Sequence, residues 1–186
     1  MTPIFTGSAT ALVTPFTEEG VCFEALGQLI DQQLAGGTDA LVVAGTTGEP
    51  STMTAQEKAA VIEFTVQHVA GRVPVIAGTG SNSTAAAVAA SSQARELGAD
   101  AVLVVTPYYN KCNTAGLVAH YHAVADAAQL PVIVYNVPSR TGVNVTPAAL
   151  EQIARHPLIR AVKEASGSVP QMMAMARACP QLTFYS

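Results

Sequence analysis

Charged and aromatic residues are both scarce in this sequence of 186 residues, and tryptophan is absent. Asp, Glu, Lys and Arg make up 12% of the chain, whereas soluble proteins average about a quarter. Nine basic and 13 acidic residues give a net charge of −4 without any basic run, which argues against nucleic acid or an anionic membrane as a partner. No apolar run reaches the ~18 residues that a membrane span requires, so we expect no membrane association.

Cysteine is equally sparse. Cys22, Cys112 and Cys179 are widely separated and form no CxxC pair, so free thiols in a reducing cytoplasm fit better than a disulfide framework. The N-terminal residues carry no basic segment before an apolar stretch, which argues against a signal peptide, and we expect a cytoplasmic protein. No residue spacing predicts a metal site, because His120 and His122 lie two apart in a predicted helix and do not share a face.

Apolar residues are abundant, at 49% of the chain, and recur as short β-branched runs separated by alanine-rich stretches of helical periodicity. Such alternation predicts parallel strands joined by crossover helices, because parallel neighbours need long connections. We predict strands at Ala11–Thr14, Ala40–Ala44, Pro74–Ala77, Ala101–Thr106, Pro131–Tyr135, Ile159–Lys163 and Leu182–Tyr185. We predict helices at Phe23–Ala35, Ala55–Ala70, Thr84–Leu97, Thr114–Ala128 and Pro147–Ala154. Thr54 and Thr146 are expected to cap two of these helices.

Two architectures fit this order, a closed barrel and an open doubly wound sheet. An open dinucleotide-binding sheet has a GxGxxG loop after its first strand, and here the first strand leads into Thr14-Pro15-Phe16. Polar segments follow strand after strand: GTTGE, GTGSN, TPYYN, YNVPSRTG and KEASG. A barrel builds its active site from side chains that follow many different strands and meet on one face. We therefore predict an α/β fold of the (β/α)₈ TIM-barrel class.

A complete barrel takes about 250 residues, more than the 186 present. By this count residues 1–186 form a single barrel domain that is incomplete at the C-terminus. The chain would end inside the seventh strand, with the last strand and the C-terminal helices missing. We expect its site to be open on one side, and water entry would weaken any shift in the pKa of a buried amine.

Lys163 stands late in an otherwise apolar strand. Strand alternation puts Ala161, Lys163 and Ala165 on one face, where the small neighbours leave room for a ligand around the amine. A lysine in dry surroundings has a lowered pKa, so its neutral amine can attack a carbonyl carbon and form an imine. The alternative is a strand-end lysine that reaches solvent or pairs with Glu164.

Hydroxyl groups follow the neighbouring strands. Tyr135 ends the strand before that of Lys163, and Tyr108 and Tyr109 follow the strand before that. Thr46 and Thr47 follow the second strand, and hydrogen-bonded hydroxyls of this kind can pass a proton. Thr47, with the N–H groups of its glycine-containing loop, could also hold a carboxylate. The alternative is turn chemistry and tyrosine rings that pack in the core.

Arg140 lies in the loop after the fifth predicted strand. A guanidinium group there can bind a carboxylate through two parallel hydrogen bonds, which a lysine could not copy. The alternative is a solvated loop arginine.

Taken in order, these segments resemble the dihydrodipicolinate synthase family of pyruvate-dependent lyases. The opening FTGSATALVTPF also matches, so the resemblance covers nearly the whole chain. The arginine of VPSRTG favours this branch over the N-acetylneuraminate lyases and the aldolases of keto-deoxy sugar acids. The matching motifs are GTTGE (Gly45–Glu49), GTGSN (Gly78–Asn82), TPYYN (Thr106–Asn110), YNVPSRTG (Tyr135–Gly142) and KEASG (Lys163–Gly167).

The resemblance implies condensation of pyruvate with L-aspartate-4-semialdehyde to 4-hydroxy-tetrahydrodipicolinate, an early step of lysine and diaminopimelate biosynthesis. Thr47 would hold the pyruvate carboxylate and Arg140 the carboxylate of the aldehyde. Lys163 would form the Schiff base, and Tyr109 would reach into the site of a neighbouring subunit. No metal or organic cofactor is implied, because the lysine itself supplies the electron sink. The implied catalytic residues are Lys163, Tyr135, Thr46 and Tyr109.

The resemblance also implies a homo-oligomer, a dimer of dimers, and a regulatory site. Many family members are inhibited by lysine bound at the dimer interface, and Ser51, Asn82 and Tyr108 match positions used there. Lys58 and Ala86 stand where lysine-sensitive members often carry a His and a Glu. A gained cation and a lost carboxylate weaken binding of a cationic amino acid, so we expect lysine to inhibit this protein poorly.

Two other interpretations stay open. A pyruvate-dependent aldolase with a sugar-acid acceptor would keep the imine chemistry, and an assay with aspartate semialdehyde separates it from the first interpretation. A truncated, non-catalytic chain that associates with itself or with full-length subunits is the second alternative. Light scattering beside an activity measurement tests that one.

Overall fold

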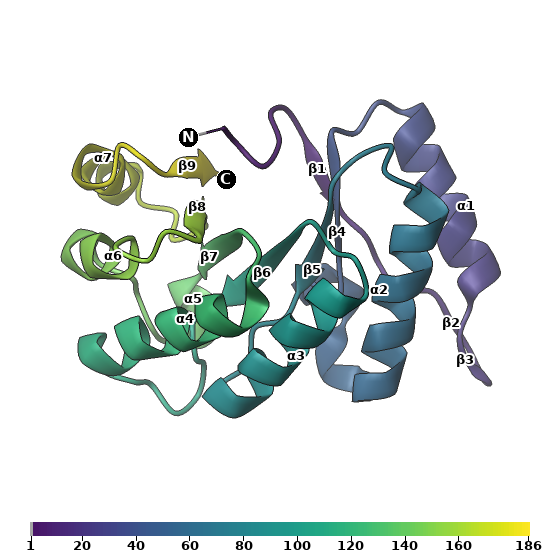
Figure 1. The fold of residues 1–186 in the computed structure, drawn as a ribbon, viewed down its shortest axis with the longest axis horizontal. Helices are drawn as coiled ribbons and strands as arrows, with labels where there is room; N and C mark the ends of the chain where they lie inside the picture. Colours follow the sequence, from purple (N-terminus) through teal and green to yellow (C-terminus); the bar gives the residue numbers. More distant parts are fainter. Residues whose placement is uncertain (1) are drawn as a thin grey trace.

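The structure is a computed structural model that describes residues 2–186. At its centre is a sheet of seven parallel strands in the order β1-β4-β5-β6-β7-β8-β9, with the helices arranged around it (Figure 1). None of the helices in this range is both long and apolar enough to cross a membrane. The strands are β1 (Ala9–Ala11), β4 (Ala40–Val43), β5 (Val75–Gly78), β6 (Ala101–Val105), β7 (Val132–Asn136), β8 (Ile159–Glu164) and β9 (Thr183–Tyr185). The helices are α1 (Phe23–Ala35), α2 (Ala55–Val69), α3 (Thr84–Glu96), α4 (Thr114–Ala128), α5 (Pro138–Thr141), α6 (Pro147–Ile153) and α7 (Val169–Ala178).

The predicted alternation of strands and helices is confirmed, and α1 and α4 begin and end at the predicted residues. Thr54 caps α2 in a reciprocal arrangement. The Glu57 N–H donates to the Thr54 hydroxyl (3.2 Å), and the Thr54 N–H donates to the Glu57 carboxylate (2.7 Å), so two N–H groups without helical partners are satisfied. Thr146 caps α6, where Pro147 occupies the first turn without losing a hydrogen bond.

The first strand lies earlier than the predicted range Ala11–Thr14, which was wrong by two to three residues. Backbone pairing with β4 ends when the Leu12 N–H donates to the Val42 carbonyl (2.9 Å). The Thr14 hydroxyl instead donates to the Gly48 carbonyl (2.8 Å). Thr14 therefore belongs to the loops above the sheet, where its buried hydroxyl finds a partner that strand pairing would not supply.

Several short elements that are not among the predicted strands and helices shape those loops. An antiparallel hairpin follows β1, two 3₁₀ turns follow β4, and the short helix α5 follows β7. They are the hairpin strands β2 (Phe16–Thr17) and β3 (Gly20–Val21), and the turns η1 (Thr46–Gly48) and η2 (Pro50–Thr52).

Strand alternation divides the core into two layers. The predicted shared face of Ala161, Lys163 and Ala165 is confirmed, since Ala161 belongs to the inner layer and Ala165 packs against it. The inner layer is formed by Ala40, Val42, Ile76, Ala101, Leu103, Ile133, Tyr135, Val137 and Ala161. The outer layer, between sheet and helices, includes Leu41, Val43, Val75, Val102, Val104, Val132, Val134 and Val162.

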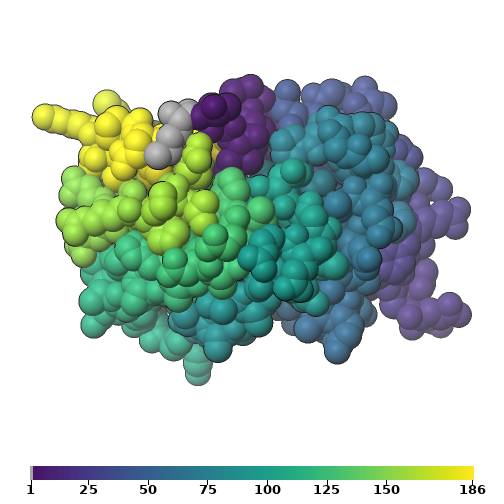
Figure 2. All heavy atoms as spheres, viewed as in Figure 1, coloured from purple at the N-terminus to yellow at the C-terminus, as the bar shows by residue number. Residues whose placement is uncertain are grey.

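The two edge strands of the sheet are β1 and β9, and the segment that precedes β1 passes close to β9 at the top of Figure 1. The Phe5 and Tyr185 rings stack with centroids 4.2 Å apart, and the Tyr185 hydroxyl donates to the Phe5 carbonyl (3.0 Å). Figure 2 accordingly shows the C-terminal residues beside the N-terminal ones. The α/β fold with a parallel sheet is confirmed. Residues 2–186 contain seven of its strands, so closure into an eight-stranded barrel stays a prediction.

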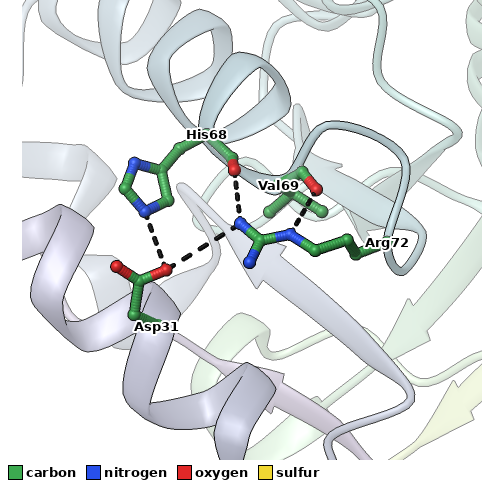
Figure 3. Close-up of polar contacts among 4 residues, drawn as sticks. All are labelled: Asp31, His68, Val69 and Arg72. Carbon is green, nitrogen blue, oxygen red and sulfur yellow. Dashed lines mark hydrogen bonds and ion pairs between the residues drawn. The ribbon is translucent and has the colours of Figure 1, made fainter.

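On the outside, polar contacts join the C-terminal ends of α1 and α2 (Figure 3). The Asp31 carboxylate lies 3.0 Å from His68 Nε2 and 3.8 Å from the Arg72 guanidinium. Arg72 also donates to the carbonyl oxygens of Val69 and His68. This cluster lies at the amino ends of the strands, because α1 and α2 end just before β4 and β5 begin.

Candidate active site

Tyr135 and Lys163 are neighbours across two strands. Their Cα atoms are register partners on β7 and β8, and both side chains point to the inner face of the sheet. Lys163 Nζ lies 4.8 Å from the centroid of the Tyr135 ring, within the range of a cation–π contact. Tyr135 is buried and Lys163 is half-buried.

A small cavity of about 130 Å³ joins this pair to three other predicted residues. Thr46 and Thr47 enter it from the turn after β4, and Arg140 enters it from α5. The cavity is lined by Ala11, Val42, Gly45, Thr46, Thr47, Leu103, Tyr135, Arg140 and Lys163. Five of the six predicted catalytic and substrate-binding residues therefore share one space at the carboxyl ends of the strands.

Burial lowers the pKa of Lys163, and the nearby Arg140 guanidinium lowers it further. Both effects disfavour the ammonium form, so a larger share of neutral amine is present at a given pH. Lys163 takes part in none of the ion pairs within residues 2–186. The alternative of pairing with Glu164 is wrong, because the buried Glu164 carboxylate accepts hydrogen bonds from Asn136 and from the Ser166 N–H instead.

Close backbone packing holds the turn that carries Thr46 and Thr47. A Cβ atom placed on Gly78 would lie 2.3 Å from the Ala44 carbonyl oxygen, and one on Gly80 would lie 2.5 Å from the Val105 nitrogen. The loops after β4, β5 and β6 therefore touch main chain to main chain, which only glycine allows here. This contact fixes the turn beside Lys163.

Arg140 is positioned by the short helix α5. The N–H groups of Arg140 and Thr141 both donate to the Val137 carbonyl (3.0 and 3.1 Å). Gly142 ends the helix with a φ of 71°, a backbone conformation that favours glycine. The Lys111 side chain packs directly against this glycine, since a Cβ there would come 2.9 Å from Lys111 Cε.

Tyr109 is the predicted catalytic residue that does not line the cavity. It is 88% exposed, and its φ of 69° is left-handed, a conformation that a residue with a bulky side chain rarely adopts. The described chain thus presents this ring to the outside.

A second groove, of about 240 Å³, runs between α2 and α3 and reaches Thr46 and Tyr135. Of the predicted lysine-site residues, Lys58 and Tyr108 line it, and so does Ala86. Lys58 is the only charged residue among its lining residues. Ser51 and Asn82 lie outside the lining, and the Asn82 carbonyl accepts a hydrogen bond from the Asn110 side chain (3.1 Å).

The two histidines of α4 lie apart, as predicted. His120 is buried, and its Nδ1 lies 2.9 Å from the Thr84 hydroxyl, while His122 Nε2 lies 3.1 Å from the Ile153 carbonyl oxygen. Burial lowers the pKa of His120. Each histidine has a hydrogen-bonding role between α4 and a neighbouring segment.

Fold and site together define a parallel α/β protein with a half-buried lysine at the carboxyl ends of its strands. The chain belongs to the dihydrodipicolinate synthetase family, whose model matches residues 4–186.

Individual relatives agree with this assignment. The 4-hydroxy-tetrahydrodipicolinate synthase of Caldicellulosiruptor saccharolyticus is 54% identical over 185 residues, which are 99% of this chain and 63% of the relative. The dihydrodipicolinate synthase of Acinetobacter baumannii, solved in complex with pyruvate, superposes with a TM-score of 0.94 at 43% identity, over 97% of this chain and 62% of that one. The enzyme of Cyanidioschyzon merolae with lysine bound gives a TM-score of 0.94 at 42% identity, over 98% and 63%. The chain thus spans somewhat less than two thirds of the relatives it matches.

Proposed function

We propose that this protein is a Schiff-base lyase that condenses pyruvate with L-aspartate-4-semialdehyde to 4-hydroxy-tetrahydrodipicolinate, in lysine and diaminopimelate biosynthesis. The observation that carries the proposal is the half-buried Lys163 amine, which lies against Tyr135 in a cavity shared with Arg140. Family membership supports the same reaction. A biosynthetic enzyme of this kind acts in the cytoplasm.

The reaction begins with attack of the neutral Lys163 amine on the C2 carbonyl carbon of pyruvate. The carbinolamine loses water to give an imine, and the hydroxyls of Tyr135 and Thr46 accept and return the protons that move. Loss of a proton from C3 gives an enamine, whose carbon attacks the aldehyde carbon of the second substrate. The amino group of that substrate then attacks the imine carbon, closes the ring and releases Lys163.

Two groups orient the substrates. The Thr47 hydroxyl holds the pyruvate carboxylate, and the Arg140 guanidinium binds the carboxylate of the aldehyde through two parallel hydrogen bonds. Both residues line the cavity that contains Lys163. Arg140 thus has two effects, since it binds substrate and also disfavours the ammonium form of the lysine.

The working protein is a homo-oligomer, a dimer of dimers. Exposure of the Tyr109 ring supports this, because a phenol ring that is 88% exposed on a left-handed backbone is available to pack against another chain, and tyrosine is enriched at such interfaces. In that arrangement Tyr109 completes the proton relay of a neighbouring subunit. The regulatory lysine site lies at the groove of Lys58 and Tyr108, with Ser51 and Asn82 at its margin.

Trapping with borohydride tests the proposal. Reduction in the presence of pyruvate should leave one stable adduct on Lys163, with Lys58 and Lys111, the other two lysines, unmodified. Peptide mass mapping locates the adduct, and Lys163→Arg is the matched control. No adduct, or one spread over the three lysines, would contradict the proposal and favour a non-catalytic, self-associating chain. If the adduct forms but aspartate semialdehyde is not consumed, the sugar-acid aldolase becomes the better interpretation.

A further inference from the structure

Asn136 and Glu164 form a second side-chain pair directly beside the pair of Tyr135 and Lys163. They are the next register partners on β7 and β8, and alternation turns them toward the opposite, outer face. Both are buried, with exposed fractions of 0% and 3%. Asn136 Nδ2 donates to Glu164 Oε2 over 2.9 Å.

Backbone N–H groups fix the orientation of both side chains. The Ser166 N–H donates to Glu164 Oε1 (2.7 Å), and the Val145 N–H donates to Asn136 Oδ1 (2.9 Å). A backbone N–H can only donate, so the amide oxygen of Asn136 must face Val145 and its nitrogen must face Glu164. Both Glu164 oxygens are then acceptors, as suits a carboxylate.

The hydrogen bonds continue outward to α7. Asn136 Nδ2 also donates to Asn144 Oδ1 (3.0 Å), and Asn144 exchanges two hydrogen bonds with Gln171 (2.7 and 3.0 Å). The network therefore joins the ends of β7 and β8, α7, and the loop 137–145 that carries Arg140. No catalytic group of the proposed mechanism belongs to it.

We propose that Asn136 and Glu164 are a positioning pair that keeps β7 and β8 in register and so holds Lys163, Tyr135 and Arg140 in their catalytic arrangement. The role of the pair in catalysis rests on the proposed function, whereas its structural coupling to Lys163 does not. Register is critical because a slip by one residue would turn the lysine to the outer face. A buried donor or acceptor that loses its partner is costly, so the two strand ends are held together specifically.

The donor–acceptor asymmetry allows a reciprocal exchange to test the pair. Glu164→Gln must keep its oxygen toward Ser166, which brings its NH₂ against the NH₂ of Asn136. Asn136→Asp brings two carboxylates together. In the double variant, the amide introduced on β8 donates to the carboxylate introduced on β7. The original hydrogen bond is thus restored in the reverse direction, and the net charge equals that of the parent protein. Asn144 and Gln171 can follow by turning their amide groups.

The readout is the pH midpoint of Lys163 acetylation by trace acetic anhydride, measured by peptide mass mapping with Lys58 and Lys111 as internal standards. We expect the midpoint to rise by about one pH unit in Glu164→Gln, because the displaced amine meets more water. It should rise in Asn136→Asp as well, where the added negative charge acts in the same direction, and it should return in the double variant. For Glu164→Gln, loss of a nearby negative charge alone would lower the midpoint. A lower midpoint in Glu164→Gln would therefore contradict the positioning role of the pair. Glu24→Gln, at an exposed glutamate, should leave the midpoint unchanged.

Other outcomes are equally decisive. Unchanged midpoints in both single variants, or a double variant no better than the singles, would overturn the proposal. If the singles fail to fold and the double variant folds, the coupling is supported. If none of the three variants folds, Asn144→Ala, at the exposed end of the network, tests the proposal instead. We expect a smaller rise in the acetylation midpoint of Lys163, and an unchanged midpoint would contradict the positioning role of the pair. Acetylation needs no substrate, so a protein that fails pyruvate trapping but shows the reciprocal rescue would reject the proposed function and keep the positioning pair.

Discussion

Lys163 Nζ lies 4.8 Å from the centroid of the Tyr135 ring, and the two residues are register partners on the neighbouring strands β8 and β7. Two opposing influences act on the amine there. The ring face attracts the ammonium form, while burial and the Arg140 cation disfavour it and lower the pKa of Lys163. The amine is thus placed beside a phenol that can pass a proton, in a state closer to the neutral nucleophile than that of a surface lysine.

Replacing Arg140 tests this electrostatic balance. Arg140→Ala removes the neighbouring cation, so the pKa of Lys163 should rise, and the pH midpoint of pyruvate trapping should move up by at most about one unit. At a fixed pH below the midpoint, trapping should become slower. Arg177→Ala, which removes an arginine on α7, is the matched control. Identical pH profiles for the two variants would show that Arg140 does not act on the lysine.

Tyr135→Phe separates the ring from its hydroxyl. The ring would still lie under Lys163, so we expect little change in stability or in the pH midpoint of lysine acetylation. Imine formation should slow roughly 10²-fold, since proton transfer by a positioned side chain contributes on that scale. Trapping reactions quenched at intervals and followed by mass spectrometry give the rate. Tyr108→Phe, in the second groove, should trap at the parent rate, and equal slowing in both variants would argue against a special role for Tyr135.

The sequence predicts the strands and helices well because their signals are local. Periodicity, the caps at Thr54 and Thr146 and the apolar runs need no knowledge of distant residues. The first strand was misplaced because Thr14 finds its partner at Gly48, a contact made 34 residues away. The Asn136–Glu164 pair was not predicted for the same reason. Adjacent letters in the YN and KE motifs do not reveal that two polar side chains meet on the buried outer face.

Glycine at position 78 is required by packing rather than by backbone conformation. Gly78→Ala would place a methyl group 2.3 Å from the Ala44 carbonyl oxygen, so we expect a loss of about 2 kcal/mol or more in the free energy of unfolding. Gly37→Ala is the comparison. At Gly37 no atom lies within 4 Å of the added carbon, whereas the φ of 80° is unfavourable for alanine. This backbone strain alone should cost about 1 kcal/mol. Urea unfolding measures both, and equal losses would contradict close backbone contact.

Asp31 should matter little to stability or chemistry. Its contacts with His68 and Arg72 are exposed, with 58% of the Asp31 side chain accessible, and exposed ion pairs contribute about 0–1 kcal/mol. Asp31→Ala should therefore change the free energy of unfolding by less than about 1 kcal/mol and leave pyruvate trapping unaltered. Thermal and urea unfolding check the first expectation. A larger loss would mean that the junction of α1 and α2 is more cooperative than its exposure suggests.

Regulation by lysine should be weak because of the charge in the second groove. Lys58 is the only charged residue among the residues lining that groove, and it would repel the side-chain ammonium of a lysine ligand, while Ala86 offers no carboxylate to pair with it. We expect no saturable binding of L-lysine below ~1 mM, a concentration that corresponds to about −4 kcal/mol, by calorimetry. The double variant Lys58→His with Ala86→Glu removes a cation and adds an anion, and it should bind lysine at least about tenfold more tightly than the parent protein. Ala86→Gln in place of Ala86→Glu controls for side-chain size. Tight binding to the parent protein would show that the ligand avoids Lys58, and the charge argument would then be wrong.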